Sequence, residues 1–366
     1  MLRLPVELLT RIALYLDPYI ESLDEPFFEI HPNASQRNRK DIYAFCLISR
    51  ECRAVGQQIL YRSVRIESTK HAKTLSCTLR MHPELPTKVR RLQLTTTKTE
   101  NEPELIPGFL SVMSNVAMLD LNVQWSGQPT FALDAITKPL NADPLQHVTT
   151  LQLTGDMLAI LSYELPCLSR LWLKELPDEL PNIQRSHEIG FLGIEAPLRS
   201  TEPVSYMNEP GPWWSSFERL GCVQVKELEV FFHSVDHELA GMHFTGQYLI
   251  DQVHKLWPDL QKLDIKLDSH IWFETTASFQ RFESLTHLSV PYHLLLDEHC
   301  DKSKNSLPYG LQELEIILEI SEYEVTYSEA FREDSLNFQI LHRPLRASMA
   351  VLTNRNLIWK TFCQLF

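Results

Sequence analysis

A six-residue apolar pattern, Φ-x-x-Leu-x-Φ with Φ being Leu, Ile or Val, recurs nine times and constrains the fold of this 366-residue chain more than any other feature. The last two apolar residues of each copy are two positions apart, so they lie on one face of a short strand. The copies begin at Val89, Val116, Val148, Leu168, Ile189, Val225, Leu260, Leu285 and Leu311. Their spacing of 20–36 residues predicts a series of short strands with a longer connection between each strand and the next.

Several of these connections have the apolar spacing of amphipathic helices. Apolar residues between positions 249 and 257 recur at i, i+1, i+4, i+7 and i+8 and stop at Pro258, and residues 157–165 have a similar pattern before Pro166. Residues 105–113 follow it more loosely. Strand and helix alternating at this period is typical of leucine-rich-repeat proteins, and the chain resembles that family over residues 64–320.

The resemblance implies an α/β fold: a solenoid with parallel strands on a concave face and helices or loops outside, in which stacked repeats share one core. The Asn or Cys expected three residues after each hexad is absent from all nine copies. We therefore expect an irregular solenoid. The alternative is that the hexads are strands of some other α/β sheet.

The first sixty residues have a different pattern, which predicts three helices. Pro5 suits the first turn of a helix, because its missing N–H costs nothing there. An apolar run over residues 42–48 ends at Ser49, which can cap the helix that follows. In the first helix, four apolar residues share an arc of about 100°: Leu8, Leu9, Ile12 and Leu16. Three short helices bury too little apolar surface to be stable alone, so a partner or the rest of the chain must cover them.

Residues 1–63 resemble an F-box. The matching positions are Leu4, Pro5, Glu7, Leu8, Leu9 and Ile12, followed by Leu47, Ser49, Arg50, Cys52 and Arg53. The ending Ile59-Leu60-Tyr61-Arg62-Ser63-Val64 is similar to fungal members of the family. A polar, proline-containing insert at residues 17–40 replaces the short connection of most F-boxes.

The F-box resemblance implies docking on the Skp-type adaptor of a cullin-based (SCF) ubiquitin ligase. The residues expected to contact the adaptor are Leu4, Pro5, Leu8, Leu9, Ile12, Leu16 and Leu47. The alternative is that the leucines of the first helix are ordinary core residues that pack on the next domain.

In the expected solenoid, residues between the apolar positions of a strand point out of the concave face. These include Arg91, Met118, Arg170, Trp172, Phe191 and Phe231. Aromatic and arginine side chains dominate interface hot spots, so Arg170, Trp172, Phe191 and Phe231 are the candidate cargo contacts. The alternative is that loops cover these rings and make them part of the core.

Two further stretches interrupt the repeats. Residues 195–224 hold four prolines and the pair Trp213-Trp214, which either contact cargo or fix this long loop to the repeats. The hexad is lost after about residue 320, so residues 321–366 are expected to cap the last repeat.

Composition excludes several classes of protein. With 47 acidic and 34 basic residues the net charge is −13, which argues against a nucleic-acid binder. Seven scattered cysteines without a C-x-x-C pair favour a reducing compartment, and no apolar stretch reaches the length of a membrane span. We therefore expect a location in the cytoplasm or nucleus. No phosphate-binding, nucleophile or metal-ligand motif is present, so neither an enzyme, a metal site nor a cofactor is expected.

The sequence thus favours a substrate-recognition subunit of an SCF-type ubiquitin ligase, with the F-box holding the adaptor and the repeats holding a protein cargo. Such a subunit acts by proximity and contributes no bond-making residue. Two alternatives are a leucine-rich-repeat scaffold without a role in ubiquitination, and an unrecognised enzyme on an α/β fold.

Overall fold

The structure is a computed structural model that describes residues 4–16, 32–97, 112–124, 145–174, 187–198, 222–234, 242–267, 271–275, 277–291, 294, 307–319 and 346–349. The chain divides into two compact units, Met1–Leu168 and Ser169–Phe366. The expected domain boundaries at residues 63 and 320 stay predictions.

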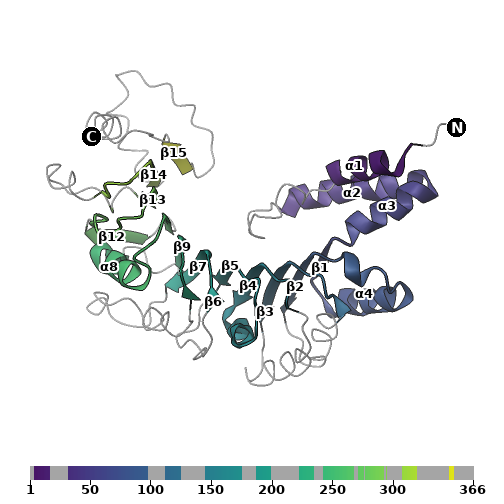
Figure 1. Cartoon of the computed structure of the whole chain (residues 1–366), viewed down its shortest axis with the longest axis horizontal. Helices are drawn as coiled ribbons and strands as arrows, with labels where there is room; N and C mark the ends of the chain where they lie inside the picture. The colour runs from purple at the N-terminus through teal and green to yellow at the C-terminus, as the bar shows by residue number, and fades with distance from the viewer. Residues whose placement is uncertain are drawn as a thin grey trace, which may run out of the picture. The chain divides into compact units, whose positions relative to one another are not determined.

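Unit 1 begins with three helices, α1 (Val6–Tyr15), α2 (Pro32–Ile48) and α3 (Arg50–Leu60), which lie side by side in Figure 1. Residues 4–16 and 32–60 are called the helical module below. Helix α2 begins at Pro32, inside the stretch of residues 17–40 that was expected to be an insert, and the insert itself stays a prediction. Residues 17–31 lie outside the described part of the chain.

The sheet of unit 1 follows the helical module. Strands β1 (Ser63–Ile66), β2 (Arg91–Thr97), β3 (Met118–Gln124) and β4 (Thr150–Thr154) pair in sequence order, and all are parallel. Helix α4 (Thr69–Met81) and the 3-10 turn η1 (Pro86–Lys88) connect β1 to β2, and a second 3-10 segment, η3 (Gly155–Ser162), follows β4.

Unit 2 continues the same plan with β5 (Arg170–Lys174), β7 (Phe191–Leu198), β9 (Glu227–Ser234), β11 (Lys262–Leu267), β13 (His287–Pro291) and β14 (Glu313–Glu319), paired in that order. These strands are parallel, and β15 (Arg346–Met349) joins β14 antiparallel. Two small parallel pairs accompany this sheet: β6 (His187–Glu188) with β8 (Cys222–Val223), and β10 (Met242–Thr245) with β12 (Ile271–Thr275).

All nine hexads form strands of these parallel sheets, as their spacing predicted. Their central leucines pair with one another across neighbouring strands, Leu92 with Leu119 and Leu119 with Leu151 in unit 1. In unit 2 the same ladder runs through Leu171, Leu192, Leu228, Leu263, Leu288 and Leu314. Each of these leucines is at most 3% exposed, so they form the spine of the core on one face of each sheet. The expected α/β class is confirmed at this level.

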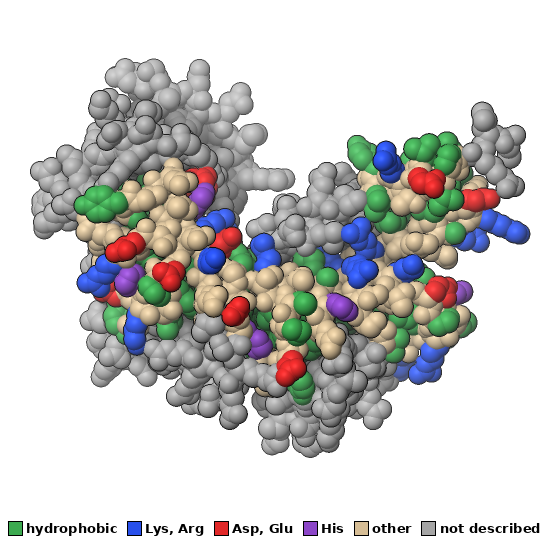
Figure 2. All heavy atoms as spheres, in the orientation of Figure 1, with side chains coloured by type: hydrophobic (Ala, Val, Ile, Leu, Met, Phe, Trp, Pro, Cys, Tyr) green, Lys and Arg blue, Asp and Glu red, His purple; other side chains and the backbone are tan. Residues whose placement is uncertain are grey.

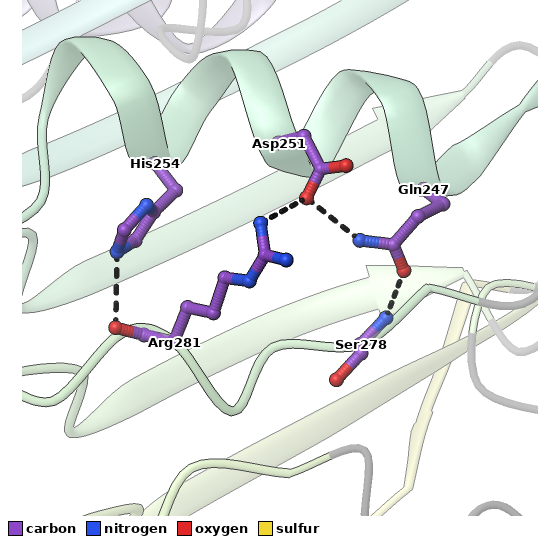
Figure 3. A network of polar contacts seen from close by, with 5 residues as sticks. All are labelled: Gln247, Asp251, His254, Ser278 and Arg281. Atoms are coloured by element: carbon purple, nitrogen blue, oxygen red, sulfur yellow. Dashed lines mark hydrogen bonds and ion pairs between the residues drawn. The ribbon is translucent and has the colours of Figure 1, made fainter.

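Of the helices expected between the strands, α8 (Gly246–Leu256) forms where the spacing predicted it. Its apolar stripe of Leu249, Ile250 and Val253 is buried. Its polar side contacts the segment after β12, as Figure 3 shows: Gln247 Oε1 accepts from the Ser278 backbone N–H at 2.7 Å, and Asp251 Oδ1 accepts from Arg281 Nη1 at 3.1 Å. These bonds hold α8 against residues 278–281 of the same unit.

The other two expected helices have different outcomes. Residues 155–162 form the 3-10 segment η3 rather than an α-helix, and Met157, Leu158, Ile160 and Leu161 are buried. The apolar residues that set the predicted spacing are buried, but the spacing did not distinguish an α-helix from a 3-10 helix. Most of the helix expected over residues 105–113 lies outside the described ranges, as do the expected cap residues 321–345 and 350–366.

No helix within the described ranges combines the length and the apolar character needed to cross a bilayer.

Candidate functional site

The helical module has a small core to which all three helices contribute. It consists of Leu9, Ala13, Ile42, Phe45, Cys46, Cys52, Val55 and Ile59. Both α1 and α2 pack on α3. Gly56 of α3 allows a close approach, because a Cβ at this position would lie 2.3 Å from Cys46 Sγ on α2.

Two local features determine where α1 and α3 begin. The Ser49 side chain accepts a hydrogen bond from the Cys52 backbone N–H at 3.0 Å, so it caps α3 as predicted. Pro5 lies one position earlier than predicted: it is the residue before α1, with φ −56° and ψ 147°. Its carbonyl oxygen accepts from the backbone N–H groups of Leu8 and Leu9, at 3.1 Å each, which starts the helix.

The side of α1 that faces away from the core is apolar and exposed. Leu8 is 44% and Ile12 is 42% exposed, and Leu4 and Tyr15 are more exposed still. At 100° per residue these four side chains fall within an arc of about 80°, so they make one stripe along the helix. This stripe is called the α1 face below.

Helix α2 adds further exposed apolar side chains. Leu47 is 78% exposed, and Tyr43 and Ile48 are also exposed. Tyr43 and Leu47 are four residues apart and therefore share one side of α2. Figure 2 shows hydrophobic side chains gathered on the visible surface of the helical module. A monomeric protein rarely exposes so many neighbouring apolar side chains unless they bind something.

Five of the seven residues expected to contact an adaptor are exposed on this module: Leu4, Pro5, Leu8, Ile12 and Leu47. The other two residues are not exposed enough to contact a partner. Leu9 is 5% exposed, and Leu16 is half-buried against the same core. The four apolar residues of α1 share an arc of about 100°. Leu8 lies at one edge of this arc and faces solvent, whereas Leu9 lies at the other edge and faces α3. Leu9 and Leu16 are therefore core residues.

The residues expected to contact cargo have a different environment. The rings of Trp172 on β5 and Phe191 on β7 are in contact, with their centroids 4.8 Å apart, and the guanidinium carbon of Arg170 lies 4.5 Å from the Phe191 ring centroid. Trp172 is 4% and Phe191 is 7% exposed, while Arg170 and Phe231 are half-buried. The core alternative thus describes Trp172 and Phe191 better. Trp213 and Trp214 lie outside the described residues.

The same correction applies to two residues of unit 1. Arg91 and Met118 were expected to point out of the sheet into solvent, but both are buried. Alternation along a strand sets the face on which a side chain lies, whereas its exposure depends on what covers that face.

Charged residues of unit 2 form cross-strand contacts on the face opposite the leucines. Lys266 of β11 binds Glu229 of β9 at 2.5 Å and Asp264 of its own strand at 3.2 Å. Burial lowers the pKa of Lys266, but the two carboxylates outweigh that effect and raise it overall. On the next strands Glu313 contacts His287 at 2.9 Å, and Glu315 accepts from Ser289 at 3.0 Å.

Among the described residues, no group of three or more His, Cys, Asp or Glu side chains is placed to hold a metal ion. Five cysteines in these ranges are free, and Cys46, Cys52 and Cys222 are buried. Burial raises the pKa of the Cys46 thiol and raises that of Cys222 to about 12, so neither thiol ionises readily at neutral pH.

A comparison with known protein families found no match, and a search of curated proteins found no similar sequence.

Proposed function

We propose that the chain is the substrate-recognition subunit of an SCF-type ubiquitin ligase, with the helical module docking on a Skp-type adaptor and the repeated strands binding a protein cargo. The observation that supports the adaptor contact best is the α1 face. Its leucines and isoleucine occupy the positions that the F-box motif reserves for apolar residues, and they are exposed while a separate set of side chains fills the core.

The energetics of such docking are adequate. Burying the exposed half of an aliphatic side chain such as Leu8 or Ile12 contributes about 1 kcal/mol. The α1 face offers several such side chains, and Leu47 and Tyr43 add more area on α2. Association also has an entropic cost, so binding requires a partner that covers most of these residues at once.

The nine hexads support the second half of the proposal. Parallel strands in register, each preceded by a buried apolar residue, are what the leucine-rich-repeat resemblance implies for residues 64–320. A cargo protein would bind this region, and ubiquitination would follow from proximity rather than from any residue of this chain. The cytoplasm or nucleus is the corresponding location.

Co-purification of the Skp-type adaptor with the full chain tests the proposal. The double variant Leu8→Asp/Ile12→Asp places two carboxylates in the contact, and we expect adaptor affinity to fall at least ~100-fold, about 3 kcal/mol. Both residues are exposed, so the module should still fold.

Val6→Asp is the matched control. Val6 is also an exposed apolar residue of α1 but lies on the other side of the helix from the α1 face. We expect this variant to keep the adaptor. Equal adaptor recovery with the double variant and with the control would refute the proposed contact.

A further inference from the structure

A hollow of about 590 Å³ opens in unit 1, where the amino-terminal ends of β2, β3 and β4 meet the end of α3. Its lining includes Gln58 from α3, Arg62 from the turn before β1, Lys88 from η1, and Arg90, Asn115 and Thr149 from the residues that lead into β2, β3 and β4. This hollow is called the basic groove below. It is separate from the α1 face and uses none of its residues.

The charge of the basic groove is opposite to that of the chain. Arg62, Lys88 and Arg90 line it, whereas no Asp or Glu is among its described lining residues. The chain as a whole has a net charge of −13. None of these three cations forms an ion pair with another described residue. Figure 2 shows several Lys and Arg side chains on the visible face of this part of unit 1.

Hydrogen bonds fix the walls of the groove but leave most of its donors unused. Arg90 Nη1 donates to the Asn115 carbonyl oxygen at 3.3 Å, and Asn115 Nδ2 donates to the Thr87 carbonyl oxygen at 2.9 Å. The backbone N–H groups of Arg90 and Arg91 both donate to the Arg62 carbonyl oxygen. The donors left for a ligand are therefore side chains: the Arg62 guanidinium, the Lys88 ammonium and the remaining N–H groups of Arg90.

A site with several cationic donors and no carboxylate selects an anion. Two guanidinium groups and an ammonium match a phosphate monoester better than a single carboxylate, because the phosphate offers three terminal oxygens and more negative charge, whereas a carboxylate offers two oxygens and one charge. A phosphate monoester has about −1.5 to −2 charges at neutral pH. The hollow is also of the size of typical small-ligand sites, roughly 300–1,000 Å³, which is larger than a phosphate group needs.

We infer that the basic groove binds a phosphate monoester attached to a larger group, with Arg62, Lys88 and Arg90 contacting the phosphate oxygens. This binding does not depend on the adaptor contact. The phosphate monoester belongs either to a phosphorylated side chain of a peptide or to a free phosphorylated small molecule, and both present the same dianion.

The test measures binding of the full chain, without adaptor, to two fluorescent peptide libraries with degenerate flanks, one with a central phosphoserine and one with serine. We expect at least 10-fold tighter binding of the phosphoserine library. The double variant Arg62→Gln/Arg90→Gln should lose this preference. Lys88→Gln, whose side chain is exposed and forms no hydrogen bond to a described residue, should weaken it at least about 3-fold without changing the fold.

Arg65→Gln is the control, because Arg65 lies three residues from Arg62, pairs with Glu67 at 2.8 Å and does not line the groove. It should bind like the unmodified chain, as should Leu8→Asp/Ile12→Asp. Free O-phosphoserine distinguishes the sources: equal affinity for it and for the library assigns a small molecule, and weaker affinity assigns a peptide.

Equal binding of both libraries, or unchanged phosphoserine binding by Lys88→Gln and the double variant, would overturn the inference. Tighter binding of a single-stranded oligonucleotide than of either phosphoserine probe would also overturn it.

Discussion

At the scale of single residues, the close approach of Trp172 to the neighbouring strand explains a glycine in the middle of β7. A Cβ on Gly193 would lie 2.0 Å from Cε3 of Trp172 and within 2.4 Å of two further indole atoms. The indole is buried and contacts the Phe191 ring, so it has little room to move. Only glycine at position 193 permits this packing.

We therefore expect Gly193→Ala to destabilise the chain by about 1–3 kcal/mol, the usual cost of overpacking a core. Urea unfolding followed by tryptophan fluorescence measures the change. Gly190→Ala is the control: its nearest contact would be the Ser169 carbonyl oxygen at 3.7 Å, an ordinary distance, so its stability should change little. A stability as high for Gly193→Ala as for Gly190→Ala would show that the indole relaxes easily.

At the scale of elements, the charges between β9 and β11 contribute to pairing of these strands. Lys266 is 22% exposed at its side chain and neutralises Glu229 and Asp264, which are less exposed. Removing the ammonium would leave two carboxylates close together without a counter-charge.

Lys266→Met should lower the free energy of unfolding by about 1–3 kcal/mol near neutral pH. Lys262→Met is its matched control on the same strand, because Lys262 is exposed and has no ion pair to a described residue; we expect it to be close to neutral.

The pKa of Lys266 is raised in the folded chain. Its contribution is therefore complete below the ordinary lysine pKa of about 10.4 and is lost as pH rises through the higher folded pKa. From neutral pH upward, the difference in stability between Lys266→Met and the unmodified chain should shrink only once the pH exceeds about 10.4. A difference that is already absent at pH 7 would contradict the role of the ion pair.

The elements also show what the sequence could and could not predict. All nine hexads formed strands, because a repeated Leu two positions from a second apolar residue leaves little choice of buried face. Strand β1 was missed although Tyr61, Val64 and Ile66 follow the same spacing with Val in place of Leu. The start of α2 at Pro32 was missed because residues 32–40 are polar and lack an apolar stripe.

The candidate contact could be predicted only in part, for a geometric reason. Helical periodicity placed Leu8, Leu9, Ile12 and Leu16 on one arc, but the side of the arc that faces α3 is a tertiary property. The basic groove could not be predicted from the sequence, because Arg62 comes beside Lys88 and Arg90 only through the pairing of β1 with β2.

At the scale of the whole molecule, we propose that one chain has two binding surfaces, the α1 face and the repeated strands. The helical module has an exposed apolar face, and a different set of side chains fills its core. The strands that follow form a repeated α/β architecture within each unit. A receptor subunit requires both, since one must hold the ligase while the other holds the cargo. We therefore expect point substitutions on the α1 face to remove the proposed adaptor contact without disturbing the proposed cargo contact.

Site-specific photo-crosslinking in the full chain tests whether the α1 face touches the adaptor. A photoreactive phenylalanine analogue is placed at Ile12 or Tyr15 on this face, or at Val6 and at Met81 of α4, both exposed but off it. We predict crosslinks to the Skp-type adaptor from positions 12 and 15 and none from positions 6 and 81. Crosslinks from position 6 or 81 alone, or from no position while the adaptor is present in excess, would contradict docking through α1.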